Sequence, residues 1–475
     1  MKDFGPIVSG KITLNPLTLL IGPNNSGKSY AAMLIHSLFE SFTPDIPVSM
    51  IKNFPRYFTT HMFRREFSEL WSQIDNVKEG EELEIPLENI IIKIFEEVYN
   101  KRLNSEILRS YACPLRELIK IGEKSFILKI SYNSNETNLL YQEDKLKVKW
   151  YPELDIRIKV EVLEQRDIRI EVLKDDKVFH KGRRMKVWET REGREDMSLK
   201  MMQLISELLL VDIFKNMGVP CYYLPAARSG ILQGHKALAA TIVKKSPLVG
   251  IEKQEIPKFS GIVSDFISSI LSLPEEEGPF YQLAQDLEGE LLKGEIVVKT
   301  LDEYFYPEIR YNFQGAEIPL HRASSTVSEL TPLILYLKYM VEPGSILIIE
   351  EPEAHLHPEN QRILAKYLVK LIRNGVNIVI TTHSDYLIEQ LSSFILLSRV
   401  EPEKRVSKYG YTEEDYLKFD EVAAYVFNYD EKNSGYKISE IGITEEDGIS
   451  QEEHMRIIEA LYEETLKLRK DLSSE

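Results

Sequence analysis

The sequence predicts an α/β fold whose core is a parallel or mixed sheet, with an antiparallel β-rich lobe and a helical lobe inserted into it. Three aliphatic runs predict the core sheet, because Leu17–Ile21, Ile346–Ile349 and Val376–Ile380 have the composition of strands buried on both faces. Polar side chains follow each run, as they do at the carboxyl edge of a parallel sheet. In residues 156–163 and 168–173, aliphatic and charged residues alternate, which predicts antiparallel strands with one wet face.

The composition narrows the class of protein before any motif is considered. With 475 residues, 43% of them hydrophobic, the chain can bury a large core spread over two or three subdomains. Its net charge of -16 argues against a protein that coats nucleic acid through bulk positive charge. Cys113 and Cys221 make no disulfide framework, the first residues lack a signal-peptide pattern, and no apolar run is long enough to span a bilayer. We therefore expect a soluble, cytoplasmic protein without a membrane partner.

The first chemical motif is a phosphate-binding loop that follows the first aliphatic run. Residues 22–29 read GPNNSGKS and fit the pattern GxxxxGKS between a predicted strand and a predicted helix at 30–39. Gly22 and Gly27 let the backbone turn its N–H groups toward a pyrophosphate at the positive end of that helix. Lys28 places a mobile charge on the terminal phosphates, and the Ser29 hydroxyl can bind magnesium. The alternative, a plain glycine-bearing turn, does not explain the flanking strand and helix.

The second motif lies at the ends of the other two predicted strands. Glu350 and Glu351 directly follow the run 346–349, and His383 follows the run 376–380. A carboxylate at such a strand end can hold magnesium, and its neighbour can orient and deprotonate the water that attacks a phosphoryl group. A histidine on a neighbouring strand can reach the γ-phosphate and sense it. A merely packed His383 remains the alternative interpretation of that residue.

The combination of loop lysine, strand-end glutamates and strand-end histidine resembles the ABC-type ATPases, which include the structural-maintenance-of-chromosomes, RecF and OLD groups. The segments "GPNNSGKSY", "ASSTVSELTPLILYL", "LIIEEPEAHLHPE" and "VITTHS" look most like the small OLD-like AAA ATPases. These segments cover about the first 40 residues and 320–400. The resemblance implies a P-loop ABC-type ATPase head, with ATP and Mg²⁺ as cofactors.

The resemblance also assigns roles to individual residues. Glu351 becomes the catalytic glutamate and His383 the switch histidine, and both are expected to be catalytic. Ser29 and Glu350, the first acidic residue of Walker B, are expected on the magnesium side. Walker A, the ATP-binding loop, comprises Gly22, Pro23, Asn24, Asn25, Ser26, Gly27, Lys28 and Ser29.

The segment 324–330, "SSTVSEL", takes the place of the signature motif of that superfamily. The motif reaches across a head-to-head dimer to the γ-phosphate bound by the partner, and its expected contacts here are Ser324, Ser325 and Glu329. Two departures from the superfamily pattern stand out. Glu350 occupies a position that is usually aspartate, and Thr326 follows Ser325 where glycine is usual. We therefore expect an ATPase (ATP and water to ADP and phosphate) that is slow unless a partner stimulates it.

The domain organisation follows from the long interval between the two motifs, which contains prolines and no sustained heptads. We expect a discontinuous head made of 1–40 plus 196–237 plus 315–400. Residues 41–195 are expected to form an inserted lobe that is helical and then β-rich, and 238–314 an inserted helical lobe. Residues 401–475 are expected to be a C-terminal α/β tail, preceded by a strand in "FILLSR", with no appended nuclease domain.

The segment after Walker B also suggests a different chemistry. Glu353, His355 and His357 have the residue types of zinc ligands, so a metal-dependent hydrolase with an incidental phosphate loop is one alternative to the ATPase. In the resembling family, the same segment is a loop that faces the second subunit. The sequence favours this second interpretation.

Two further segments carry weaker signals. In "YYLPAARSG", Arg228 is expected to approach a nucleotide or a partner, or to be a plain surface residue, and Gln233 is the candidate for the Q-loop glutamine of the superfamily. The basic run "KGRRMK" at 181–186 is expected on a β-hairpin, where it is either a DNA contact or a solvated turn.

The function that the sequence favours is an ATP-dependent switch. Two chains are expected to sandwich two ATP molecules as a homodimer, and closure is expected to control DNA or an effector protein such as a nuclease or toxin, as in defence or repair ATPases. A transporter nucleotide-binding subunit is another alternative, which the altered signature and the large inserts disfavour. The sequence leaves open whether DNA is bound and whether dimers assemble further.

Overall fold

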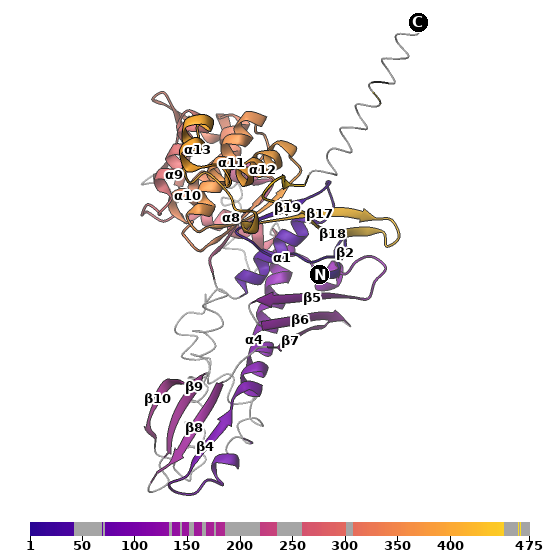
Figure 1. The fold of residues 1–475 in the computed structure, drawn as a ribbon, viewed down its shortest axis with the longest axis vertical. Helices are drawn as coiled ribbons and strands as arrows, with labels where there is room; N and C mark the ends of the chain where they lie inside the picture. The colour runs from indigo at the N-terminus through magenta and orange to yellow at the C-terminus, as the bar shows by residue number, and fades with distance from the viewer. Residues whose placement is uncertain are drawn as a thin grey trace, which may run out of the picture. The chain divides into compact units, whose positions relative to one another are not determined.

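A computed structural model describes residues 1–41, 69, 72–132, 135–142, 145–151, 156–163, 168–174, 177–185, 219–234, 259–300, 307–450, 464 and 466. Internal contacts divide the chain into two compact units (Figure 1). Unit 1 comprises Met1–His36, Arg109–Ile121 and Pro220–Glu475, and unit 2 comprises Ser37–Leu108 and Gly122–Val219. Residues 196–218 of the expected head and 451–475 of the expected tail, apart from 464 and 466, lie outside the described residues.

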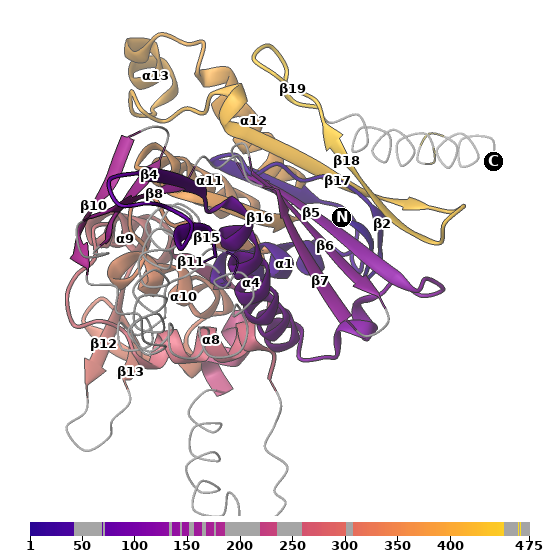
Figure 2. The same ribbon diagram turned by 90° about the horizontal axis from the view of Figure 1, so that it is seen from below.

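Unit 1 is built on a mixed sheet whose strands follow the order β11-β15-β16-β3-β17-β18-β2-β1. Its parallel part consists of β11 (Cys221–Leu224), β15 (Ile346–Glu350), β16 (Asn377–Thr382), β3 (Leu17–Ile21) and β17 (Val422–Asp430). β18 (Gly435–Ile441) runs antiparallel to β17 in the long hairpin seen in Figure 2, followed by β2 (Ile7–Ser9) and β1 (Lys2–Phe4). The predicted α/β class with a mixed core sheet is confirmed.

Helices cover both faces of the central strands. Every position of β3 and β15 is buried, as parallel strands between helices require. Leu19 and Ile349 belong to one core cluster with residues of α10 (Ser325–Tyr339), α11 (Pro358–Arg373) and α12 (Asp385–Leu397). On the opposite face lies α1 (Lys28–Glu40), whose His36 ring packs 5.4 Å from the Tyr223 ring of β11. The same aliphatic runs that predict the strands therefore explain the layers.

The rest of unit 1 packs around these layers, and Figure 1 shows α9 to α13 grouped together. These elements are η1 (Leu115–Leu118), α8 (Gly261–Leu271), α9 (Tyr281–Leu287), the π-helical turn η5 (Glu288–Leu292), β12 (Glu295–Thr300), β13 (Pro307–Phe313), β14 (Ala316–Pro319), η6 (Leu320–Arg322), α13 (Pro402–Tyr409), η7 (Phe419–Glu421), β19 (Ile443–Thr444) and β20 (Gly448–Ile449). The predicted strand in "FILLSR" is wrong, because Phe394, Ile395 and Leu397 form the last turn of α12. Their apolar spacing continues the buried face that begins at Leu387.

The domain ranges expected from the sequence stay a prediction. Two structural observations concern segments that were expected outside the head. Phe266 of α8 and Leu287 of α9 belong to the same core cluster as the central strands. β17 and β18, which come from the expected C-terminal tail, pair within the sheet of unit 1.

Unit 2 contains an antiparallel meander, a four-stranded antiparallel sheet and most of the helix α4 (Glu88–Tyr111). β5 (Ser125–Tyr132), β6 (Asn135–Gln142) and β7 (Lys145–Tyr151) form a meander. The other sheet has the order β10-β9-β8-β4 and consists of β10 (Lys177–Met185), β9 (Ile168–Lys174), β8 (Ile156–Val162) and β4 (Glu82–Pro86). Burial alternates along β8, which confirms the predicted half-buried strand. β9 and β10 form the expected hairpin, but the side chains of the basic run lie outside the described residues.

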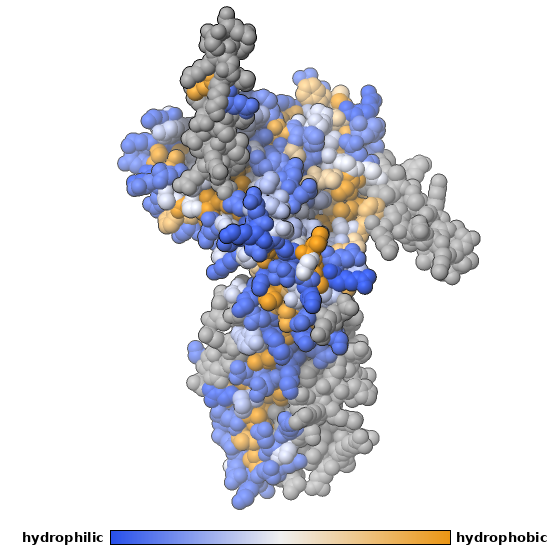
Figure 3. Space-filling model, turned by 90° about the vertical axis from the view of Figure 1, so that its right-hand side faces the viewer, coloured by the Kyte–Doolittle hydropathy of each residue, from blue (hydrophilic) through white to orange (hydrophobic). Residues whose placement is uncertain are grey.

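The surface seen in Figure 3 is largely hydrophilic, with hydrophobic residues in separate groups. Among the helices in the described part of the chain, none is long and apolar enough to cross a membrane.

Candidate functional site

The register of three parallel strands brings the sequence motifs together. β16 lies between β3 and β15, with Thr382 opposite Ile21 and Thr381 opposite Glu350. The three strands end at the same edge of the sheet. The residues that follow them, namely the phosphate loop, Glu351 and His383, are therefore neighbours at that edge. Residues that are far apart in the sequence thus share one edge.

The phosphate loop runs from the end of β3 into α1, which begins at Lys28. Gly27 has a φ of +99°, and a Cβ there would lie 2.8 Å from Cγ of Pro6, so only glycine fits. A Cβ on Gly22 would lie 3.1 Å from Cβ of Phe427 in β17, so this strand packs directly against the loop. The exposed residues of the loop are Pro23, Asn24, Asn25 and Ser29, whereas Ser26, Gly27 and Lys28 are buried.

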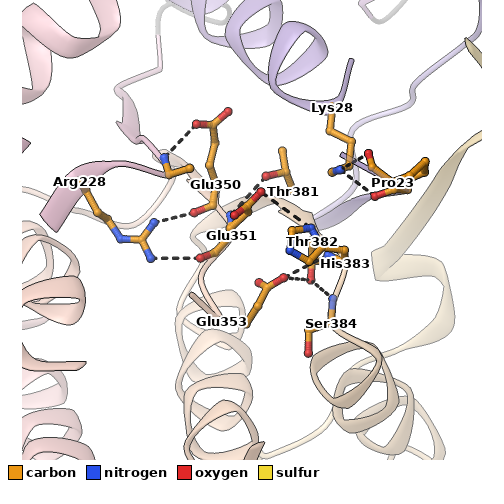
Figure 4. Close-up of polar contacts among 12 residues, drawn as sticks. Pro23, Lys28, Arg228, Glu350, Glu351, Glu353, Thr381, Thr382, His383 and Ser384 are labelled. Carbon is orange, nitrogen blue, oxygen red and sulfur yellow. Dashed lines mark hydrogen bonds and ion pairs between the residues drawn. The ribbon is translucent and has the colours of Figure 1, made fainter. Parts of the chain in front are cut away.

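The Lys28 ammonium is the cationic centre of the loop. Its Nζ donates hydrogen bonds to the carbonyl oxygens of Gly22, at 2.7 Å, and Pro23, at 2.8 Å. Burial lowers the pKa of Lys28, while the carboxylates of Glu351, Glu353 and Glu350, in that order, oppose the shift. The acidic strand end and the loop lysine therefore lie within electrostatic reach of each other (Figure 4).

Glu350, the last residue of β15, is buried and only partly satisfied. Its Oε2 accepts a hydrogen bond from the backbone N–H of Ala226 at 2.9 Å, but its Oε1 lacks a hydrogen bond of acceptable geometry within the described residues. Burial raises the pKa of Tyr223, and the nearby Glu350 carboxylate adds to that shift. A buried carboxylate oxygen with spare acceptor capacity fits a divalent cation or its bound water.

Glu351 begins the turn after β15 in a left-handed backbone conformation, with φ at +44°. Its N–H donates to the Thr381 carbonyl at 2.9 Å, which fixes the turn to β16. Its Oε1 lies 3.8 Å from Nδ1 of His383, and the two side chains are 34% and 44% exposed. The carboxylate and the imidazole are therefore neighbours that remain accessible to a ligand.

Two of the three residues that suggested a zinc site, Glu353 and His357, have other partners. Oε1 of Glu353 accepts hydrogen bonds from the Thr382 hydroxyl and the His383 N–H. His357 caps α11, with Nδ1 accepting from the Glu359 N–H at 3.4 Å. Within the described residues, no group of three or more His, Cys, Asp or Glu side chains could hold a metal ion. The interpretation as a zinc hydrolase gains no support from this part of the chain.

The segment that replaces the signature motif begins α10. Ser324 is the N-cap and accepts a hydrogen bond from the Val327 N–H at 3.3 Å, and both Ser324 and Ser325 are exposed. Glu329, the third residue expected to contact a partner, has a side chain that is only 1% exposed and lies 2.8 Å from the guanidinium of Arg228. Gln233 donates to the Ser328 hydroxyl at 3.4 Å.

Arg228 is the residue that the sequence places least well. It lies just after β11 and is 1% exposed, so it is not the plain surface residue that the sequence offered as one alternative. Its guanidinium hydrogen-bonds the carbonyl oxygens of both Glu350 and Glu351 (Figure 4). The small residues around it in "AARSG" are the only sequence signal of a close approach by neighbouring backbone.

Comparisons with known proteins identify the family of the chain. The model of the AAA ATPase domain family matches residues 1–388. A comparison with curated proteins found no match. Three similar solved structures are an SMC head bound to the C-winged helix domain of ScpA, an SMC head domain from Thermotoga maritima, and an Smc head domain with an extended coiled coil bound to the C-terminal domain of ScpA derived from Pyrococcus furiosus.

These structural similarities are distant. The sequence identities are 10%, 10% and 11%, and the TM-scores are 0.36, 0.30 and 0.34. The alignments cover 94%, 93% and 97% of this chain and 97%, 97% and 98% of those chains. The family match carries the assignment by itself, because it spans most of the chain and includes the loop, the glutamates and the histidine. The chain belongs to the AAA ATPase domain family.

Proposed function

We propose that this chain binds and hydrolyses ATP at the edge formed by the phosphate loop and the ends of β15 and β16, and that ATP closes a dimer of two chains. One observation carries the proposal. The Glu351 carboxylate lies 3.8 Å from the His383 imidazole, at the sheet edge where the strand before the Lys28 loop also ends. A phosphate held by Lys28 would therefore lie near both a general base and an imidazole donor.

Each residue has a defined task in this proposal. The loop N–H groups and Lys28 bind the β- and γ-phosphates, and Glu351 orients the attacking water and accepts its proton. His383 donates a hydrogen bond to the γ-phosphate. Ser29 and Glu350 would hold Mg²⁺, which, when bound, neutralises charge on the phosphate oxygens. The buried Oε1 of Glu350 supports this assignment, because it makes no hydrogen bond of acceptable geometry within the described residues.

The proposed dimer uses the exposed start of α10. Ser324 and Ser325 lie at the positive end of a helix of 15 residues, where hydroxyl and N–H groups suit an anion presented by a second chain. Glu329 takes no part in this contact because it pairs with Arg228. We propose slow turnover that an effector protein or DNA stimulates, and a switch whose closed state is selected by the γ-phosphate.

The test is the variant Glu351→Gln, which keeps the size of the side chain and removes the base. It should bind ATP, fail to hydrolyse it, and elute as a dimer with ATP but as a monomer without nucleotide. Glu342→Gln, at an exposed position beyond the other end of α10, is the matched control and should behave like wild type. A chain that stays monomeric at saturating ATP would refute the dimer, and a chain that does not bind ATP would refute the whole proposal.

A second experiment addresses the partner. Turnover by the wild-type chain should rise when the correct effector or a DNA duplex is added, and DNA binding should differ between the ATP-bound and nucleotide-free states. DNA that neither binds nor changes turnover would leave a protein effector as the proposed partner.

A further inference from the structure

We infer that Arg228 is a positioning residue that sets the orientation of Glu351 and ties it to the start of α10. The inference rests on the proposed function, because it presumes that Glu351 acts on ATP. It concerns a residue that does not itself touch the nucleotide.

The contacts of Arg228 converge on the turn that carries Glu351. Nη1 donates to the Glu350 carbonyl at 2.6 Å, and Nη2 donates to the Glu351 carbonyl at 3.2 Å. One planar guanidinium therefore bridges the carbonyl oxygens of two consecutive residues. Nη1 also donates to the Pro225 carbonyl at 3.2 Å, which anchors the arginine to its own turn after β11.

The turn at Glu351 has a backbone conformation that its surroundings must stabilise. Glu351 adopts a φ of +44°, a conformation that a residue with a Cβ rarely adopts unless its surroundings impose it. Its N–H is fixed by the Thr381 carbonyl and its own carbonyl by Arg228. Because the N–H and the carbonyl of Glu351 are both hydrogen-bonded, the direction of its Cα–Cβ bond is fixed. The carboxylate then lies beside His383.

The same arginine connects this turn to α10. Its Nε donates to the Glu329 carbonyl at 3.2 Å, and Nη2 forms an ion pair with Oε1 of Glu329 at 2.8 Å. A movement at the start of α10 would therefore be transmitted to the Glu351 backbone through a single rigid group. Lysine cannot replace it, because one ammonium lacks the planar fork that serves several acceptors at once.

A purely structural ion pair is the competing explanation, since losing one partner of a buried pair destabilises any protein. The double variant Arg228→Met with Glu329→Gln removes both charges together and so separates the two explanations. Lys338→Met with Glu288→Gln is the matched control, because that pair is equally buried, at 1% and 2% exposed, and also involves α10. Arg228→Lys, which retains the charge, is the second test.

For each variant we would measure the thermal midpoint, ATP binding by a fluorescent analogue, and kcat and KM for hydrolysis. We expect the double variant and Arg228→Lys to fold and bind ATP, with KM unchanged and kcat lowered by about 100-fold, as misplacement of a reacting group predicts. The control pair should retain kcat. A double variant with wild-type kcat would overturn the positioning role while leaving the proposed function intact. A wild-type chain that binds ATP without hydrolysing it would overturn both.

Discussion

The Glu353 carboxylate accepts a hydrogen bond from the Thr382 hydroxyl at 2.6 Å, and both side chains are buried. The same oxygen also accepts from the His383 N–H at 3.1 Å. The loop after β15 is thereby joined to the end of β16, next to the histidine of the proposed site. Glu353 resembles a metal ligand in the sequence, yet in the fold it acts as an acceptor that organises the backbone.

Removing the Thr382 hydroxyl should therefore be costly. Thr382→Val leaves a buried carboxylate short of one donor, and we expect the free energy of unfolding to fall by about 1.5–3 kcal/mol. Thr331→Val is the control. Within the described residues, the buried Thr331 hydroxyl donates to the neutral Val327 carbonyl of its own helix, so its loss should cost about 0.5–1.5 kcal/mol. Urea unfolding measures both. Equal losses in the two variants would contradict the role of Glu353.

Lys28 should make the nucleotide-free protein less stable at neutral pH. Burial lowers its pKa below the usual value near 10.5, so the folded chain holds this proton less tightly than the unfolded chain does. The free energy of unfolding due to this group is lowest below the folded-state pKa and rises with pH up to the unfolded value. Lys28→Met should thus be more stable than wild type at pH 7, with a smaller difference at pH 10.

The same substitution should abolish ATP binding, because Met offers no charge to the phosphates. The exposed Lys408→Met is the control and should change neither stability nor binding. Urea titrations at the two pH values and a fluorescent ATP analogue provide the measurements. A Lys28→Met chain that is less stable than wild type at pH 7 would show that the two carbonyl hydrogen bonds outweigh the burial of the charge.

The central strands were predictable because their signals are local. Leu17–Ile21 and Ile346–Ile349 are short aliphatic runs followed by motif residues, and both become buried strands in the sheet. "FILLSR" is an equally apolar run, but short runs of this kind suit a buried helix as well as a strand. The amphipathic spacing that begins upstream at Leu387 favours the helix. This spacing is evident only when the whole segment is considered.

The supporting shell of the site was not predictable, because it depends on contacts between distant segments. The burial of Arg228 requires acceptors from the turn after β15 and from α10, which lie more than a hundred positions away in the sequence. A single arginine among small residues carries no trace of those partners. For the same reason, the pairing of β17 with β3 leaves no local mark in an otherwise acidic tail.

Glu350 should set the metal requirement of ATP turnover. Glu350→Gln keeps an acceptor for the Ala226 N–H but removes the charge from a carboxylate whose Oε1 makes no acceptable hydrogen bond within the described residues. We expect the Mg²⁺ concentration for half-maximal hydrolysis to rise by about tenfold or more, as for residues that hold a metal through its bound water. Chelator should abolish turnover in wild type, and added Mg²⁺ should restore it. An unchanged Mg²⁺ dependence in the variant would show that Glu350 does not help to hold the metal.

Zinc should be absent from the purified protein. Glu353 and His357 already accept hydrogen bonds from Thr382 and Glu359, and the described residues contain no metal-ligand cluster. Elemental analysis before and after chelation measures the content directly. Stoichiometric zinc that is lost in His355→Ala would revive the hydrolase interpretation.

His383 should affect the chemical step more than nucleotide binding. Its imidazole lies 3.8 Å from the Glu351 carboxylate, is partly exposed, and follows a strand that pairs with the strand before the phosphate loop. A donor placed there stabilises the charge that develops on the γ-phosphate in the transition state, so His383→Ala should lower kcat by about 100-fold with little change in ATP affinity. His321→Ala, at an exposed histidine in η6, is the control. Weaker ATP binding with an unchanged kcat would instead assign His383 to ground-state binding, because only an interaction stronger in the transition state changes kcat.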